Sequence, residues 1–155
     1  MENEKIIEIA DLREKLQGIP RPHYLSGSGR LIHRGRKVSL TGNVIFASDR
    51  NPSIKDRTDK YLKNPHVNVA DCAFAFWNAA HIIADYLGYT TRTLVDEVRF
   101  IPEKLISPDT ELDLYLMAEE KRSIGNTCLG VLEGAISMES EPLIRVSAKY
   151  LSEKP

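Results

Sequence analysis

The sequence NPHVNVAD at residues 64–71, followed by CAFAFWNAAHIIADYL at residues 72–87, decides the fold of this chain. Asn68 is a preferred N-cap residue, and Asp71, three positions later, completes a capping box and opposes the positive end of the helix dipole. Gly88 stands where a left-handed residue commonly ends a helix. The stretch therefore predicts one long helix over residues 68–87.

Apolar residues occupy almost every side of this helix, which predicts burial on nearly all sides. Asp71, Asn78, His81 and Asp85 lie within it, and charges are costly at the depth of a bilayer, so a membrane span is not expected. His81 is expected to be a hydrogen-bonded core residue. A buried helix needs a layer that wraps it, and the rest of the sequence supplies strands.

Bulk properties narrow the class of protein. A length of 155 residues suggests a single domain over residues 1–155, and a formal net charge of −1 gives no case for nucleic acid as a partner. Cys72 and Cys128 have no metal-ligand spacing, so we expect free buried thiols and neither a metal nor a cofactor. The charged start at residues 1–5 lacks a signal-peptide pattern, and a cytoplasmic location is expected.

Three kinds of segment precede the helix. Residues 3–17 have apolar positions at roughly helical spacing, which predicts a short amphipathic helix. Residues 31–33 and 38–46 are rich in β-branched residues and alternate in polarity, which predicts two strands joined by a tight connection. Residues 48–64 are polar and highly charged, and we expect a loop of a length that is often functional.

Strands dominate the chain after the helix. The strand-like segments cover residues 92–101, 111–118, 127–137 and 143–151. Strands, then one buried helix, then more strands indicate an α+β protein with an antiparallel sheet. A curled antiparallel sheet wrapped around one long buried helix is the hotdog fold. Exposed strand edges favour a homodimer or a higher homo-oligomer.

Residues within and ahead of the helix resemble a known family. The matching residues are Gly42-Asn43, Tyr61, His66-Val67-Asn68, Phe76 and Asn78. They resemble the FcoT-type long-chain fatty acyl-CoA thioesterases, which are hotdog enzymes of fatty acid metabolism. The resemblance covers roughly residues 24–87. It implies an acyl thioester hydrolase whose substrate carries coenzyme A or an acyl carrier protein (ACP).

The family builds its active site from tyrosines and asparagines, without an obvious carboxylate base or nucleophile. The resemblance implies catalytic roles for Tyr24, Tyr61, Asn68 and Asn78. Asn78 follows Asn68 by ten positions where the family spacing is nine, and Trp77 occupies the ninth position here. This shift turns the side chain by about 100° around the helix.

Thioester hydrolysis needs an oxyanion site, a positioned water and room for the leaving thiolate. The start of the helix offers unpaired backbone N–H groups and a positive dipole end, so amides within residues 67–70 are expected to bind the oxyanion. Asn68 or Tyr61 would orient the water, and Tyr24 would hydrogen-bond the thioester. The residues expected to contact substrate are His66, Val67, Val69 and Asp71. Asp71 is also a candidate acid or base.

Other interpretations of the same residues remain open. Asn68 and Asp71 are equally well explained as helix caps, and Asn78 as a buried amide that satisfies a backbone group. His66 is placed like the base of hotdog dehydratases, which also use a helix carboxylate fourteen positions later, where this chain has Ala80. A hydroxyacyl-thioester dehydratase or hydratase is therefore one alternative. A non-catalytic module that binds acyl thioesters is another.

Overall fold

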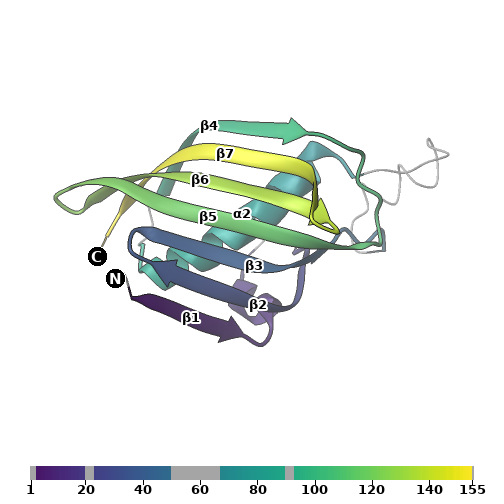
Figure 1. The fold of residues 1–155 in the computed structure, drawn as a ribbon, viewed down its shortest axis with the longest axis horizontal. Helices are drawn as coiled ribbons and strands as arrows, with labels where there is room; N and C mark the ends of the chain where they lie inside the picture. The colour runs from purple at the N-terminus through teal and green to yellow at the C-terminus, as the bar shows by residue number, and fades with distance from the viewer. Residues whose placement is uncertain (1–2, 20–22, 50–66, 90–92, 155) are drawn as a thin grey trace.

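A curled sheet and one long helix make up most of the chain (Figure 1). The computed structural model describes residues 3–19, 23–49, 67–89 and 93–154. These residues form β1 (Glu4–Ile9), the 3-10 helix η1 (Leu12–Leu16), β2 (Leu25–Arg34), β3 (Lys37–Ile45), α2 (Val69–Leu87), β4 (Thr93–Pro102), β5 (Glu111–Ile124), β6 (Thr127–Met138) and β7 (Glu141–Glu153). The strands form one sheet in the order β1-β2-β3-β5-β6-β7-β4, and all neighbours are antiparallel.

The helix begins and ends as its sequence predicts. Asn68 is the N-cap and forms a capping box with Asp71, and Gly88 closes the other end with a left-handed φ of 70°. Glycine adopts this conformation without the steric cost that a Cβ would add. The predicted helix over residues 68–87 is confirmed.

The burial of α2 is more one-sided than its composition suggests. The fully buried positions are Asp71, Cys72, Ala75, Phe76, Asn78, Ala79, Ile82 and Ile83. His81 is exposed, as are Val69, Ala70 and Asp85, so the expected burial on nearly all sides and the expected core role of His81 are wrong. Several residues on the outer side of the helix are alanines, whose small side chains lose little by being exposed, and this explains why α2 is less buried than expected. No helix formed by the described residues is long and apolar enough to cross a membrane.

The inner face of the sheet supplies the layer on which the helix packs. In β5, Leu112, Leu114, Leu116 and Ala118 are buried, while the residues between them face the other side of the sheet. Figure 1 shows α2 crossing behind β2, β3 and β5, and these strands contact it. One helix held against a curled antiparallel sheet is the hotdog arrangement, and the predicted fold is confirmed.

The N-terminal segment differs from its prediction. Instead of a helix over residues 3–17, Glu4–Ile9 forms β1 at the edge of the sheet, and only Leu12–Leu16 is helical, as the 3-10 helix η1. The β-branched residues Ile6, Ile7 and Ile9 favour a strand, and pairing with β2 gives their backbone groups partners. Tertiary pairing thus overrides a weak helical periodicity.

Two glycines allow η1 to sit close beneath the sheet. Leu12 is fully buried, and a Cβ at Gly42 would lie 2.6 Å from Leu12 Cδ1. A Cβ at Gly29 would lie 2.6 Å from Leu12 Cδ2 and 2.9 Å from the carbonyl oxygen of Thr41. Both glycines therefore accommodate the same leucine, but only Gly29 is also confined by backbone.

We expect Gly42→Ala to lower the free energy of unfolding by about 1–3 kcal/mol, because the added methyl would overlap Leu12. In a Leu12→Ala background the same change should cost almost nothing, since the other atoms near that Cβ are at least 3.8 Å away. Urea unfolding of the two single variants and the double variant measures this coupling. Gly29→Ala is the matched control, because Thr41 still blocks its methyl. If Leu12→Ala restored the stability of both glycine variants equally, the result would contradict the assigned contacts of Gly42 and Gly29.

Candidate functional site

The first turn of α2 is fixed by reciprocal hydrogen bonds. The backbone N–H of Asp71 donates to Asn68 Oδ1 over 2.9 Å, and the backbone N–H of Asn68 donates to Asp71 Oδ2 over 3.2 Å. Asp71 is 4% exposed. Each side chain thus satisfies an amide that the start of a helix would otherwise leave without a partner. The capping role of both residues is therefore present in the structure.

Tyr24 is brought to the same place from the sheet. Its hydroxyl donates to Asp71 Oδ1 over 3.2 Å, and its carbonyl accepts from the Ile45 N–H over 3.0 Å. Its ring is buried against Phe46, with ring centroids 4.9 Å apart. The structure therefore brings Tyr24, which is distant in sequence, into one hydrogen-bonded group with Asn68 and Asp71 at the start of α2.

Backbone amides of the first turn differ in what they can still bind. The N–H of Val67 donates to the carbonyl of Ile106 over 2.7 Å, and that of Asn68 is taken by Asp71. Within the described part of the chain, Val69 and Ala70 have no such partner for their N–H groups, and both residues are exposed. The amides able to bind an oxyanion are therefore those of Val69 and Ala70, at the positive end of the helix dipole.

Asn78 lies further along the helix. It is 1% exposed and follows Asp71 by seven residues, which places it on the same side of α2, about 10 Å along the axis. Asn78 therefore does not reach the first turn. Its catalytic role, like the contacts of Val67 and Val69 with substrate, stays a prediction. Tyr61 and His66 lie outside the described residues.

The environment of the first turn of α2 changes the pKa of the Cys72 thiol. Burial, together with the negative charge of Asp71, raises the pKa of the Cys72 thiol from 9.0 to about 12. Both effects disfavour the thiolate, which is the nucleophilic form of cysteine. Cys72 and Cys128 are free and buried, as expected. Cys72 is therefore an inert neighbour of the site rather than a nucleophile.

His23 is a residue of interest that the sequence did not single out. It directly precedes Tyr24, and its Nδ1 atom is buried without a hydrogen-bond partner among the described residues. A buried nitrogen of this kind normally finds a protein, water or ligand partner. The sequence signal that could have pointed to His23 is its position directly before Tyr24. Among the residues that the structure describes, no group of three or more His, Cys, Asp or Glu is arranged to hold a metal ion.

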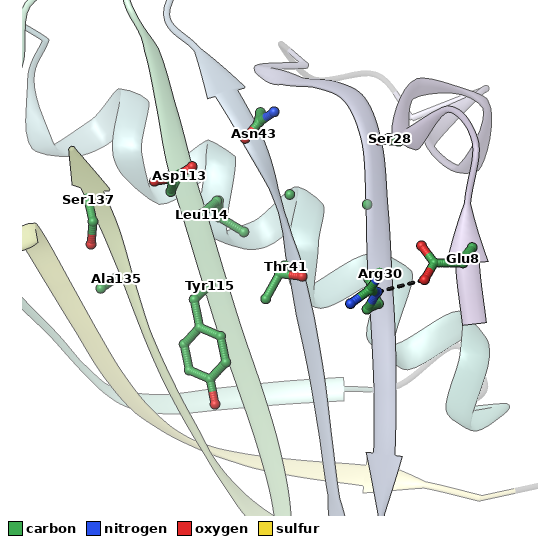
Figure 2. A pocket seen from close by; sticks show the side chains of 12 residues that line it. Glu8, Ser28, Arg30, Thr41, Asn43, Asp113, Leu114, Tyr115, Ala135 and Ser137 are labelled. Atoms are coloured by element: carbon green, nitrogen blue, oxygen red, sulfur yellow. Dashed lines mark hydrogen bonds and ion pairs between the residues drawn. The ribbon is translucent and has the colours of Figure 1, made fainter. Parts of the chain in front are cut away.

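A cavity of about 450 Å³ lies on the other side of the sheet (Figure 2). Its lining includes Tyr115 and Asp113 of β5, which alternate with the buried leucines of that strand and so face away from α2. Figure 2 shows the helix behind the sheet from this side. The cavity and the first turn of α2 are therefore separate features.

Comparisons with known proteins agree with this architecture. No protein-family model and no curated protein matches the sequence. Among solved structures, yhdA of Lactococcus lactis, a thioesterase candidate by name, matches with a TM-score of 0.51 and 5% identity over 81% of this chain and 90% of the other. The HP0420 homologue of Helicobacter felis matches with a TM-score of 0.50 and 13% identity over 93% and 90%.

A thioesterase superfamily protein matches less closely, with a TM-score of 0.46 and 10% identity over 78% of this chain. The chain spans about half of that protein, covering 53% of its length. At such low identities, the two closer matches show a shared fold. The protein is thus a hotdog-fold protein whose helix start carries a group of polar side chains.

The thiol of Cys72 makes a pH-dependent contribution to stability. It ionises near pH 12 in the folded protein and near 9.0 when exposed, so the folded state keeps a proton that the unfolded chain loses. This stabilisation is complete below pH 9 and is lost as the pH rises towards 12. In a Cys128→Ala background, the free energy of unfolding should therefore fall more steeply across this pH window when Cys72 is present than when it is replaced by alanine.

The substitution Asp71→Asn should lower the pKa of the Cys72 thiol, which is measured from the ultraviolet absorbance of the thiolate. An unchanged pKa would contradict the influence of Asp71.

Proposed function

We propose that this protein hydrolyses acyl thioesters of coenzyme A or of an acyl carrier protein. The observation that carries the proposal is the group formed by Tyr24, Asn68 and Asp71 at the start of α2, beside the amides of Val69 and Ala70, which no described residue pairs with. A carbonyl oxygen that gains charge during the reaction is stabilised by N–H groups fixed in this way. The hotdog fold, which several named thioesterases share, supports the same class of reaction.

The hydrogen bonds suggest a route for the proton of the attacking water. The Tyr24 hydroxyl donates to Asp71, and a phenolic oxygen can accept a proton from water while it passes its own proton on. Water forms the new C–O bond at the thioester carbon while one proton moves to Tyr24 and another from Tyr24 to Asp71. The C–S bond then breaks, and the leaving thiolate takes the proton back. The products are a carboxylic acid and a free thiol.

In this mechanism the side chain of Asn68 positions the attacking water. Its Oδ1 atom is occupied by the Asp71 N–H, which leaves the two Nδ2 hydrogens for water or the thioester. Tyr61 is proposed to share this role, and His66, Val67 and Val69 to contact the acyl or pantetheine part of the substrate. Asn78 would act further along the helix, beside the acyl chain.

Substitution of Asn68 separates catalysis from capping. Asn68→Ala should abolish hydrolysis and lower stability by about 1 kcal/mol. Asn68→Asp is the matched control, because aspartate caps helices as well as asparagine but has no amide hydrogens to donate. We expect Asn68→Asp to retain stability and to lose about a hundredfold or more in turnover. Release of free thiol from acyl-CoA substrates of several chain lengths measures turnover, and full activity of Asn68→Asp would reduce Asn68 to a cap.

The same assays distinguish the other candidate functions. Hydration of an enoyl-CoA, followed by loss of ultraviolet absorbance and without thiol release, would instead identify a hydratase or dehydratase. Thermal stabilisation by acyl-CoA without turnover would identify a binding module, since a ligand of the native state alone raises stability. Intact protein with no response to any acyl thioester would remove the proposed function.

We also propose that two copies pair through β4. This strand bonds to β7 on one side, and no described residue pairs with its other edge. Leu94 and Ile101 on β4 are 68% and 45% exposed, which is unusual for large apolar side chains on an uncovered strand. A second copy that continues the sheet would satisfy the free edge and cover these side chains.

Light scattering should therefore give at least twice the chain mass of 17.5 kDa for the native protein. The double variant Leu94→Lys, Ile101→Lys should shift the mass towards a single chain, because charges on an edge strand oppose pairing. Ile124→Lys is the matched control, since Ile124 is 56% exposed but lies at the far end of β5. A single-chain mass for the native protein, or an equal effect of Ile124→Lys, would contradict pairing through β4.

A further inference from the structure

The cavity on the outer face of the sheet, which we call the outer-face basin, is lined by residues of β1, β2, β3, β5 and β6 (Figure 2). Its volume of about 450 Å³ lies within the range of small-molecule sites. The hydrolytic site proposed above does not use any of these residues. The basin is therefore a second place where the chain can bind a ligand.

A β-bulge in β2 lies beside the outer-face basin. Ser26 pairs with Asn43 and Arg30 with Thr41, so residues 27–29 of β2 stand opposite Gly42 alone. Gly27 takes a left-handed φ of 67° within this bulge. A bulge bends its strand and interrupts the ladder, which opens space beside β3. The basin is thus built into the backbone and does not depend on a chance arrangement of side chains.

Strand register arranges the lining in two neighbouring rows. The first row runs across the sheet in the order Glu8, Arg30, Thr41, Tyr115, Ala135. The second row lies two residues along the strands and runs Asn43, Asp113, Ser137. Neighbouring strands are about 4.8 Å apart, so each row presents its side chains at regular intervals of that size.

The first row contains an aromatic platform. Tyr115 is 43% exposed, and its cross-strand neighbours Thr41 and Ala135 are short, so neither covers its ring. Figure 2 shows the Tyr115 side chain extending along β5, with Thr41 and Ala135 on the strands to either side. Partial burial and the nearby charge of Glu133 raise the pKa of Tyr115, so its hydroxyl stays neutral and can both donate and accept.

Polar groups around the platform are partly fixed in direction and partly unused. Arg30 Nε donates to Glu8 Oε1 over 2.6 Å, and Asn43 Nδ2 donates to Glu111 Oε1 over 2.8 Å. These bonds orient the guanidinium and the amide while leaving further donors and the Asn43 Oδ1 acceptor free. The side-chain carboxylate of Asp113, by contrast, has no hydrogen-bond partner among the described residues. The basin therefore offers donors and acceptors in two rows, and the Tyr115 ring extends from the first row along β5, away from Asn43, Asp113 and Ser137 (Figure 2).

We infer that the outer-face basin binds a polyhydroxylated ring compound, such as a monosaccharide or a cyclitol. The ligand would lie in the basin with an apolar edge against Tyr115, and hydroxyls on its opposite side would donate to Asp113 and exchange hydrogen bonds with Asn43 and Ser137. A simple anion fits poorly, since Asp113 and Glu8 repel it and Glu8 neutralises Arg30. A long acyl chain fits poorly as well, because polar groups rim the hollow.

The test is saturation-transfer and amide-shift NMR of the full chain with glucose, galactose, mannose and myo-inositol. We expect at least one of these to bind with a dissociation constant of about 1 mM. Shifts should be confined to the basin. Tyr115→Ala and Asp113→Ala should each weaken binding about tenfold or more, whereas Tyr115→Phe, which keeps the ring, should weaken it less.

Met117→Ala provides the control on the same face, one row away from Tyr115 on β5, and should leave binding unchanged. All of these variants should keep the thiol-releasing activity of the native protein, so failure here is distinguishable from failure of the hydrolase proposal. Binding of tetramethylammonium in preference to every sugar would instead identify a cation site and overturn the inference. Absence of saturable binding by all four compounds would overturn it too.

Discussion

The structure depends on the reciprocal hydrogen bonds between Asn68 and Asp71. They decide where α2 begins and hold its first turn in one conformation. The same carboxylate also accepts from Tyr24, which belongs to the sheet, so helix and sheet are joined at this point by a buried hydrogen bond. Such a bond is costly to leave unmade, because a buried carboxylate without donors loses its hydration with nothing in return. This bond holds the start of α2 against the sheet.

Local signals in the sequence were enough for the helix and for most strands. The N-cap at Asn68, the glycine at position 88 and the alternation in β5 are each determined within a few residues, and each was predicted correctly. Residues 3–17 were not, because apolar positions there fit a helix about as well as a strand. Pairing of β1 with β2 decides between them, and that pairing involves residues far apart in the chain.

The candidate site shows the same division between local and long-range information. Sequence placed Asn68 and Asp71 at the helix start and suggested Tyr24, and the structure places all three together. The sequence alone did not reveal that the Ile106 carbonyl accepts from the Val67 N–H. That contact depends on how the segment after β4 folds back. Nor did it reveal the outer-face basin, which arises from a bulge and from cross-strand neighbours that only the register defines.

The bond from the Val67 N–H to the Ile106 carbonyl has a further consequence. The end of a helix is ordinarily where its turns fray, and frayed amides must be ordered again each time a ligand arrives. Here the residue before the N-cap is anchored to another part of the chain, and the first turn is anchored to Tyr24. The loss of conformational entropy at Val69 and Ala70 therefore accompanies folding, so a ligand at the proposed site would meet amides that are already fixed in position.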